Sequence, residues 1–171
     1  AEIQAKGLHK EAICVYQEDR LETYAAILAV WCTGNTFIPI NPTYPEARVE
    51  YISQLSSSKM IIATAGSNLP YRGVVPVFHP DLNASCQTEV PEIVPYASTD
   101  IVYILFTSGS TGLPKGVQIN YENLQSFLEE TDRLGMDLPE GSGYLQLFDL
   151  SFDFSIIPFL WPFQNKSVLY P

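Results

Sequence analysis

The sequence predicts an α/β fold in which helices flank a largely parallel sheet. Short apolar strands alternate with amphipathic helices along the chain, which is the pattern of parallel sheets. The most apolar run, residues 101–106 (IVYILF), is dense in β-branched and aromatic side chains and predicts a central strand buried on both faces. The chain has 171 residues, 46% of them hydrophobic, so we expect residues 1–171 to form a single unit with one sizeable core.

The first half of the chain provides the clearest alternation of strand and helix. Residues 12–16 (AICVY) predict a strand, and residues 21–32 predict a helix with one buried face. The apolar positions of that face recur at helical spacing: Leu21, Tyr24, Ala25, Leu28 and Trp31. Residues 36–40 then predict a second strand, and Pro45 suits the first turn of a second helix. The inner face of the second helix is expected to carry Val49, Ile52 and Leu55.

The stretch between the second helix and the apolar run is less regular. Residues 60–63 (MIIA) predict a strand, whereas residues 66–100 are rich in Pro, Ser and Asn and offer only one further strand, at 74–78. Pro76 lies within that strand. Because proline lacks the N–H that a sheet ladder needs, we expect this strand at an edge of the sheet.

The last third of the chain predicts three further strands and two helices. Residues 116–119 predict a short strand, and Asn120 can cap the helix that follows. The inner face of that helix is expected to carry Leu124, Phe127, Leu128 and Thr131. A strand at 144–148, a helix at 154–163 and a last strand at 168–170 complete the pattern.

Composition excludes several classes of function. Nine Lys and Arg stand against 19 Asp and Glu, and the net charge of −10 has the wrong sign for contact with a nucleic-acid backbone. No apolar run reaches the roughly 18 residues that span a bilayer, and the first residues lack a signal-peptide pattern, so we expect a cytoplasmic location and no membrane partner. The cysteines Cys14, Cys32 and Cys86 are far apart and predict neither disulfides nor a metal site.

A glycine- and hydroxyl-rich loop follows the apolar run, at residues 107–116 (TSGSTGLPKG). Ligands of open α/β sheets bind at the carboxyl ends of strands, which is where this loop begins. Its glycines let successive backbone N–H groups approach phosphate oxygens, its hydroxyls add donors, and its lysine adds a positive charge. We expect these residues to bind the phosphates of a nucleotide: Thr107, Ser108, Gly109, Ser110, Thr111, Gly112 and Lys115. The loop lacks the Gly-Lys-Ser/Thr triplet of a Walker A motif, which argues against a P-loop kinase or GTPase.

Two segments resemble one enzyme family. Residues 103–117 (YILFTSGSTGLPKGV) resemble the signature of acyl-adenylate-forming, or AMP-binding, enzymes. Residues 28–42 (LAVWCTGNTFIPINP) are similar to the helix, glycine, strand and P-x-D/N-P turn of the same family. The family includes acyl-CoA synthetases, luciferases, amino-acid adenylation domains of nonribosomal peptide synthetases, and D-alanine:carrier protein ligases.

The resemblance implies a ligase that uses ATP and Mg²⁺ in two steps. A carboxylate attacks the α-phosphate to give an acyl adenylate and pyrophosphate, and a thiol then takes the acyl group. The thiol belongs either to coenzyme A or to the phosphopantetheine arm of a carrier protein. By the same resemblance, residues 107–112 and Lys115 hold the β- and γ-phosphates.

The resemblance also implies that other parts of such an enzyme lie beyond residue 171. These parts are the adenine-clamping motif, the ribose-binding aspartate and a C-terminal domain with the catalytic lysine, so no catalytic residue is assigned here. We therefore expect residues 1–171 to be a fragment that is inactive alone. Apolar surface that a missing part would cover should let the fragment self-associate weakly.

One motif bears on which carboxylate is activated. Residues 151–155 (SFDFS) resemble the segment in which amino-acid-activating members pair an aspartate with the substrate's α-ammonium group, and Asp153 holds that position. Asp149 has the same local pattern four residues earlier and stays an alternative, but the resemblance favours Asp153, because the spacing from it to residues 168–170 matches that of the family. Either aspartate can instead cap the following helix. An acyl-CoA synthetase acting on a non-amino acid and a non-catalytic nucleotide-binding scaffold remain the alternative functions.

Overall fold

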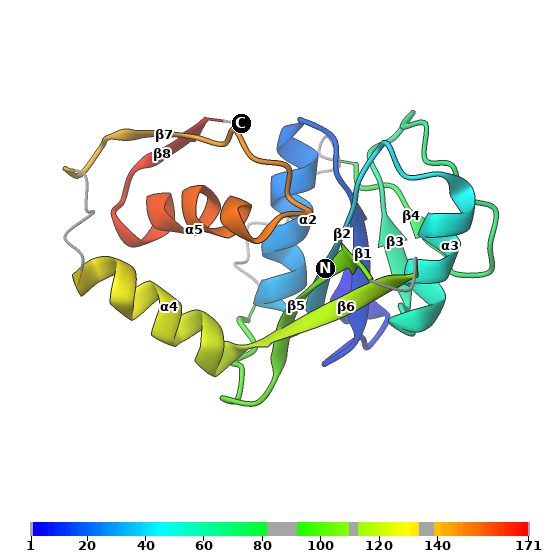
Figure 1. The fold of residues 1–171 in the computed structure, drawn as a ribbon, viewed down its shortest axis with the longest axis horizontal. Coiled ribbons are helices and arrows are strands. Elements are labelled where there is room, and N and C mark those ends of the chain that lie inside the picture. Colours follow the sequence, from blue (N-terminus) through cyan, green and yellow to red (C-terminus); the bar gives the residue numbers. More distant parts are fainter. Residues whose placement is uncertain (1, 82–91, 110–112, 134–138, 171) are drawn as a thin grey trace.

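The computed structural model describes residues 2–81, 92–109, 113–133 and 139–170. A six-stranded sheet with helices on both faces forms one side of the molecule, and a smaller C-terminal part lies beside it (Figure 1). This mixed architecture, with a mostly parallel sheet between helices, confirms the predicted fold class.

The large sheet has the strand order β4-β3-β1-β2-β5-β6. Its strands are β1 Ala12–Tyr16, β2 Thr36–Ile40, β3 Met60–Ile62, β4 Val77–Phe78, β5 Ile101–Ser108 and β6 Pro114–Asn120. Neighbouring strands pair in parallel except β5 and β6, which form an antiparallel hairpin. The strand β4 lies at an edge, as Pro76 predicts. The strand β5 lies inside the sheet between β2 and β6 and is buried from Val102 to Phe106, with side chains in the cores on both faces, as predicted for a central strand.

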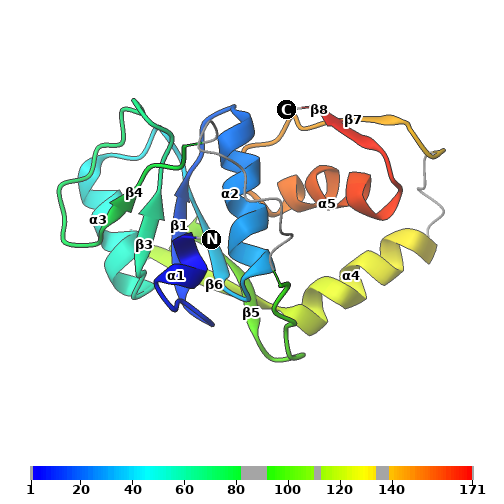
Figure 2. The same cartoon turned by 180° about the vertical axis from the view of Figure 1, so that it is seen from behind.

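The helices sit on both faces of this sheet and beside it. They are α1 Glu2–Ala5, α2 Leu21–Cys32, α3 Glu46–Leu55, α4 Tyr121–Arg133 and α5 Ile156–Gln164, and a single 3₁₀ turn, η1 Asp153–Ser155, leads into α5. Two short strands, β7 Gly143–Leu145 and β8 Val168–Tyr170, pair in parallel as a separate sheet. Figures 1 and 2 show α3 on one face of the large sheet, α2 on the other, and α5 on the far side of α2.

The buried face of α2 differs from the predicted one. Leu21 is 69% exposed, whereas the buried residues of the helix are Thr23, Tyr24, Ala26, Ile27 and Val30. The helix is apolar around most of its circumference, so more than one helical stripe fits its sequence. Leu28 and Trp31 are half-buried, and the ring of Trp31 lies 5.4 Å from that of Phe159 in α5. Because α2 is covered by the sheet on one side and by α5 on the other, no single inner face exists.

Two other predicted inner faces hold only in part. In α3, Val49 and Ile52 are fully buried, but Leu55 is 55% exposed at the end of the helix. In α4, Leu124 and Thr131 are buried, whereas Phe127 is 41% exposed. The predicted strand at 144–148 is shorter, at β7, and the predicted helix at 154–163 begins with η1.

Two consecutive strands send their following helices to opposite faces of the sheet. The helix α2, which follows β1, packs Ile27 into the core on one face, whereas α3, which follows β2, packs Val49 and Ile52 into the core on the other. The strands β1 and β2 are neighbours, so a crevice opens at their carboxyl ends, between the two helices. Such switch points are where open α/β sheets bind ligands.

Candidate functional site

The expected phosphate loop lies at the tip of the β5–β6 hairpin. Thr107 and Ser108 end β5 and are exposed. Lys115 pairs with Thr107 across the hairpin, so the lysine and a hydroxyl stand side by side at the loop's base. Ser110, Thr111 and Gly112 lie outside the described residues, so their predicted contacts with phosphate stay predictions.

The base of this loop requires glycine at residue 109. The Gly109 N–H donates a hydrogen bond to the carbonyl oxygen of Leu113 at 3.2 Å, which closes the turn. A Cβ built on Gly109 would lie 2.3 Å from that same oxygen, far inside contact distance. The oxygen belongs to the backbone and cannot rotate away, so a larger residue would force the turn open.

Lys115 provides a positive charge at the base of the loop. Its side chain is exposed, and among the described residues it forms no ion pair with an acidic group. In a chain with a net charge of −10, an unpaired lysine beside exposed hydroxyls is suited to an anionic ligand.

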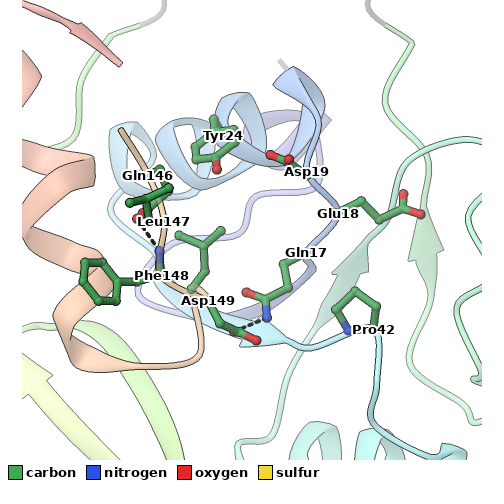
Figure 3. A pocket seen from close by; sticks show the side chains of 10 residues that line it. Gln17, Glu18, Asp19, Tyr24, Pro42, Gln146, Leu147, Phe148 and Asp149 are labelled. Carbon is green, nitrogen blue, oxygen red and sulfur yellow. Dashed lines mark hydrogen bonds between the residues drawn. The ribbon is translucent and has the colours of Figure 1, made fainter. Parts of the chain in front are cut away.

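The crevice at the carboxyl ends of β1 and β2 holds a cavity of about 260 Å³ (Figure 3). It is lined by residues 17–19, Tyr24, Pro42 and residues 146–150. Figure 3 shows Gln17 facing Asp149 across its floor, while Glu18 points away from both. The segment 146–150 therefore crosses the switch point of the sheet and occupies part of it.

Asp149 is fully engaged with hydrogen-bond donors in this crevice. Its Oδ1 accepts from Gln17 Nε2 at 2.5 Å, from Ser151 N at 2.8 Å and from Ser151 Oγ at 2.6 Å, and its Oδ2 accepts from Asn41 Nδ2. Gln17 follows β1 and Asn41 follows β2, so one carboxylate bridges the ends of two strands. The sequence did not assign a role to Gln17 or Asn41, although Asn41 is part of the P-x-D/N-P turn.

Asp153 has the opposite environment. It is exposed, it opens η1, and among the described residues its carboxylate accepts a hydrogen bond only from the N–H of Phe154, at 2.9 Å. Phe152 and Phe154 on either side are 64% and 61% exposed. The two sequence-equivalent aspartates thus differ, because Asp149 is saturated with protein donors and Asp153 keeps most of its hydrogen-bonding capacity open.

The negative charge of Asp153 also affects a tyrosine of β5. Tyr103, at the centre of that strand, is buried, and burial followed by the negative charge of Asp153 raises the pKa of its phenol to about 12. The open carboxylate and the strand that leads to the loop are therefore electrostatically coupled.

A comparison with known protein families identifies the family to which this chain belongs. The model of the family described as AMP-binding enzyme matches residues 2–169. The chain belongs to this family. Its membership agrees with the resemblance of residues 103–117 and 28–42, and it makes the chain part of an enzyme family of ligases.

Relatives of this AMP-binding chain include two curated bacterial enzymes. Gramicidin S synthase 1 of Brevibacillus brevis is 30% identical over an alignment of 180 positions. The alignment covers 96% of this chain and 15% of the synthase. The D-alanine--D-alanyl carrier protein ligase of Lactiplantibacillus plantarum is 35% identical over 152 residues, which cover 86% of this chain and 30% of the ligase. The chain thus spans between 15% and 30% of the length of these two relatives.

Solved structures share the fold of this AMP-binding chain. The nonribosomal peptide synthetase FmoA3 matches with a TM-score of 0.83 at 20% identity, over 99% of this chain and 18% of the synthetase. A four-domain nonribosomal peptide synthetase, AB3403, bound to AMP and glycine, matches with a TM-score of 0.78 at 23% identity, over 98% of this chain and 12% of that one.

The described residues contain neither a membrane-spanning helix nor a cluster of metal ligands. No helix among them is both long and apolar enough to cross a bilayer. No group of three or more His, Cys, Asp or Glu side chains there is placed to hold a metal ion, and Cys14 and Cys32 are free thiols. Burial raises the pKa of the Cys14 thiol to about 12, which makes it unreactive.

Proposed function

We propose that this chain is the phosphate-binding and substrate-amino-binding part of an enzyme that activates an amino acid as its adenylate. The observation that carries the proposal is the contrast between the two aspartates. Asp153 presents an exposed carboxylate with a single hydrogen bond from its own turn, which suits a cationic α-ammonium group. Asp149, whose oxygens are occupied by Gln17, Asn41 and Ser151, is a poor partner for a substrate.

The spacing along β5 between the proposed ammonium site at Asp153 and the phosphate loop supports the same proposal. Tyr103, whose pKa the charge of Asp153 raises, and Thr107, at the start of the loop, are four residues apart and therefore on one face of the strand. Four strand residues span about 13 Å. That length accommodates an amino acid held by its ammonium group at one end and a triphosphate held by the loop at the other.

The proposed chemistry transfers an adenylyl group to the carboxylate. A carboxylate oxygen of the amino acid attacks the α-phosphorus of ATP, the bond to the bridging oxygen breaks, and pyrophosphate leaves with the electron pair. Lys115 and the hydroxyls of Thr107 and Ser108 would bind the β- and γ-phosphates and stabilise the leaving group's negative charge. A solved structure of the related synthetase FmoA3 contains the ATP analogue AMPPNP, which supports ATP as the nucleotide.

Mg²⁺ would enter with the triphosphate. The described residues gather no set of three acidic, histidine or cysteine ligands, and Mg²⁺ in nucleotide enzymes is held largely by substrate phosphates and water. The exposed hydroxyls of Thr107 and Ser108 fit that arrangement, in which the ion neutralises phosphate charge. In this proposal, Asp153 of this chain pairs with the ammonium group and Lys115 pairs with the phosphates.

A thiol is proposed to take the acyl group in a second step. One relative is named a D-alanine--D-alanyl carrier protein ligase, and a solved relative contains an adenylation domain with its peptidyl carrier domain. We therefore favour the phosphopantetheine arm of a carrier protein over coenzyme A as acceptor. Because the chain spans at most 30% of the two curated relatives described, we expect residues 1–171 alone to show no activity.

Exchange of pyrophosphate into ATP tests the proposal in the complete protein that contains this sequence. Amino acids and the carboxylic acids that lack the amino group are compared, in wild type, Asp153→Ala and Lys115→Ala. We expect exchange only with an amino acid and a loss of about 100-fold or more in each variant, as for the removal of one strong transition-state contact. Asp132→Ala and Lys59→Ala, which also remove exposed charges, are the matched controls and should leave exchange unchanged.

Other outcomes identify the alternatives. Exchange that accepts acids without an amino group and ignores Asp153→Ala would make the protein an acyl-CoA synthetase. Wild-type protein that binds ATP but exchanges with no acid would be a nucleotide-binding scaffold.

A further inference from the structure

The segment that carries Asp153 is tied down at several points. The N–H of Phe152 donates to the backbone oxygen of Asp149 at 3.0 Å, and Ser155 Oγ donates to the backbone oxygen of Phe152 at 2.7 Å. Gln146 Nε2 donates to the backbone oxygen of Ser155 at 2.9 Å. These bonds hold residues 146–155 together as one turn, but all of them lie within the segment itself.

Asp149 supplies the polar anchor between this turn and the sheet. Its side chain accepts from Gln17 and Asn41, which follow β1 and β2, and from Ser151 on the turn (Figure 3). Gln17 and Asn41 are each 7% exposed, so their amides donate from sites that water barely reaches. A carboxylate is the side chain best suited to accept so many donors at once, and charge-assisted hydrogen bonds are about twice as strong as neutral ones.

Asn41 is itself held in one orientation. Its Oδ1 accepts from Thr43 N at 2.8 Å and from Thr43 Oγ1 at 2.6 Å. With its oxygen used in this turn, the amide presents Nδ2, a donor, to Asp149. The polarity of the contact is thereby fixed, so residue 149 must be the acceptor.

We propose that Asp149 is a positioning residue that sets the location of Asp153 relative to the sheet, and so determines selectivity for substrates with an α-amino group. This proposal rests on the proposed function, in which Asp153 pairs with that amino group. Asp149 does not contact the substrate. Its carboxylate anchors the turn at the crevice between β1 and β2, and the same turn carries Asp153 at the start of η1.

The test is a double-mutant cycle of Asp149 and Asp153 in the complete protein. The quantity compared between variants is the selectivity for the amino acid over the same acid without its amino group. The ratio of kcat/KM for the best amino acid to that for the same acid with hydrogen in place of the amino group is measured by pyrophosphate exchange. We expect Asp153→Ala to abolish the preference, Asp149→Ala to reduce it at least tenfold, and the double variant to match Asp153→Ala. The KM for ATP should change less than about twofold, because this turn shares no hydrogen bond with the described loop residues 107–109 and 113–115.

A pair exchange controls for general damage to the fold. Asp149→Asn alone places two amide donors against each other, and Asn41→Asp alone places two carboxylates together. In Asn41→Asp with Asp149→Asn, the donor and acceptor change places, while residue 149 still offers an oxygen to Gln17 and Ser151. We expect each single variant to lose selectivity and the exchanged pair to recover most of it.

The outcomes separate the two proposals. Selectivity that survives Asp153→Ala overturns the proposed function, and this inference with it. Selectivity that is lost in Asp153→Ala but kept in Asp149→Ala overturns this inference alone. A parallel loss of kcat/KM for both acids and a raised KM for ATP in Asp149→Ala, with no recovery in the exchanged pair, would show a merely structural role.

Discussion

Residues 148–151 and 152–155 have nearly the same sequence, FDLS and FDFS, but very different surroundings. In the first turn the aspartate accepts four hydrogen bonds, two of them from residues more than 100 positions away in the sequence. In the second it accepts one, from the next residue. The comparison shows that one local motif can occupy two environments, and that distant partners decide whether its carboxylate is free to meet a ligand.

The two aspartates accept different numbers of hydrogen bonds because their turns lie in different parts of the fold. The first turn crosses the crevice between α2 and α3, where the ends of β1 and β2 present buried amides that need an acceptor. The second begins η1 on the outside, flanked by Phe152 and Phe154, which are mostly exposed. The Asp149 carboxylate thus accepts four hydrogen bonds because it lies among buried amides. The Asp153 carboxylate accepts one because it is exposed.

The largest effect on this comparison is expected from Asn41→Asp. It brings a second carboxylate against Asp149 in a half-buried crevice, where neither has a cation, and should lower the free energy of unfolding by about 3 kcal/mol. Urea unfolding of this chain measures the loss. Asn68→Asp adds the same charge at an exposed position and is the matched control.

Adding Asp149→Asn to Asn41→Asp should restore most of that stability, because the pair then has one donor and one acceptor again. A double variant no more stable than Asn41→Asp would show that the contact between residues 41 and 149 does not hold the turn to the sheet.

A smaller effect distinguishes the two aspartates directly. Asp149→Asn keeps the shape but turns an acceptor of the Asn41 amide into a donor, and should cost about 2 kcal/mol of stability. Asp153→Asn loses one exposed bond at most, so its cost should stay below about 0.5 kcal/mol. Thermal unfolding of both variants under one condition gives the comparison, and equal losses would contradict the assignment of different roles.

Much of the fold could be predicted from the sequence because its signals are local. The apolar runs predicted the strands β1, β2, β3 and β5, and residues 116–119 predicted part of β6. The antiparallel pairing of β6 with β5 was not predicted. The buried stripe of α2 could not be predicted, because the helix is apolar on most sides and only its packing between the sheet and α5 decides which side chains are buried. Exposure of Leu21 is the clearest consequence.

The candidate site was predictable only where its residues lie close together in the sequence. The loop from Thr107 to Lys115 is one continuous motif, and Asp153 lies in another. The partners of Asp149 could not be found this way, because Gln17 and Asn41 lie in separate segments and meet Asp149 only where parallel strands place their ends together. The sequence therefore favoured Asp153 without excluding Asp149, and the hydrogen bonds that occupy Asp149 support the same choice.

The smallest expected effect is a change in the pKa of Tyr103 when the charge of Asp153 is removed. Burial and, second to it, the negative charge of Asp153 together raise the pKa of this phenol to about 12. Spectroscopic titration of tyrosinate should therefore show a Tyr103 pKa that is lower, and closer to its ordinary value of 10, in Asp153→Asn than in wild type. Asp132→Asn, which removes an exposed charge from α4, should leave the titration unchanged.

The same phenol links stability to pH with a definite sign. Its pKa is raised in the folded state, so its contribution to stability is complete below pH 10 and is lost as pH rises towards 12, where the unfolded chain has already released the proton. Tyr103→Phe should accordingly lose less stability than wild type between pH 10 and pH 12, and Asp153→Asn should lose it over a narrower range. Identical pH profiles for wild type and Asp153→Asn would mean that the Asp153 charge does not reach β5, and would separate the ammonium site from the strand that carries the phosphate loop.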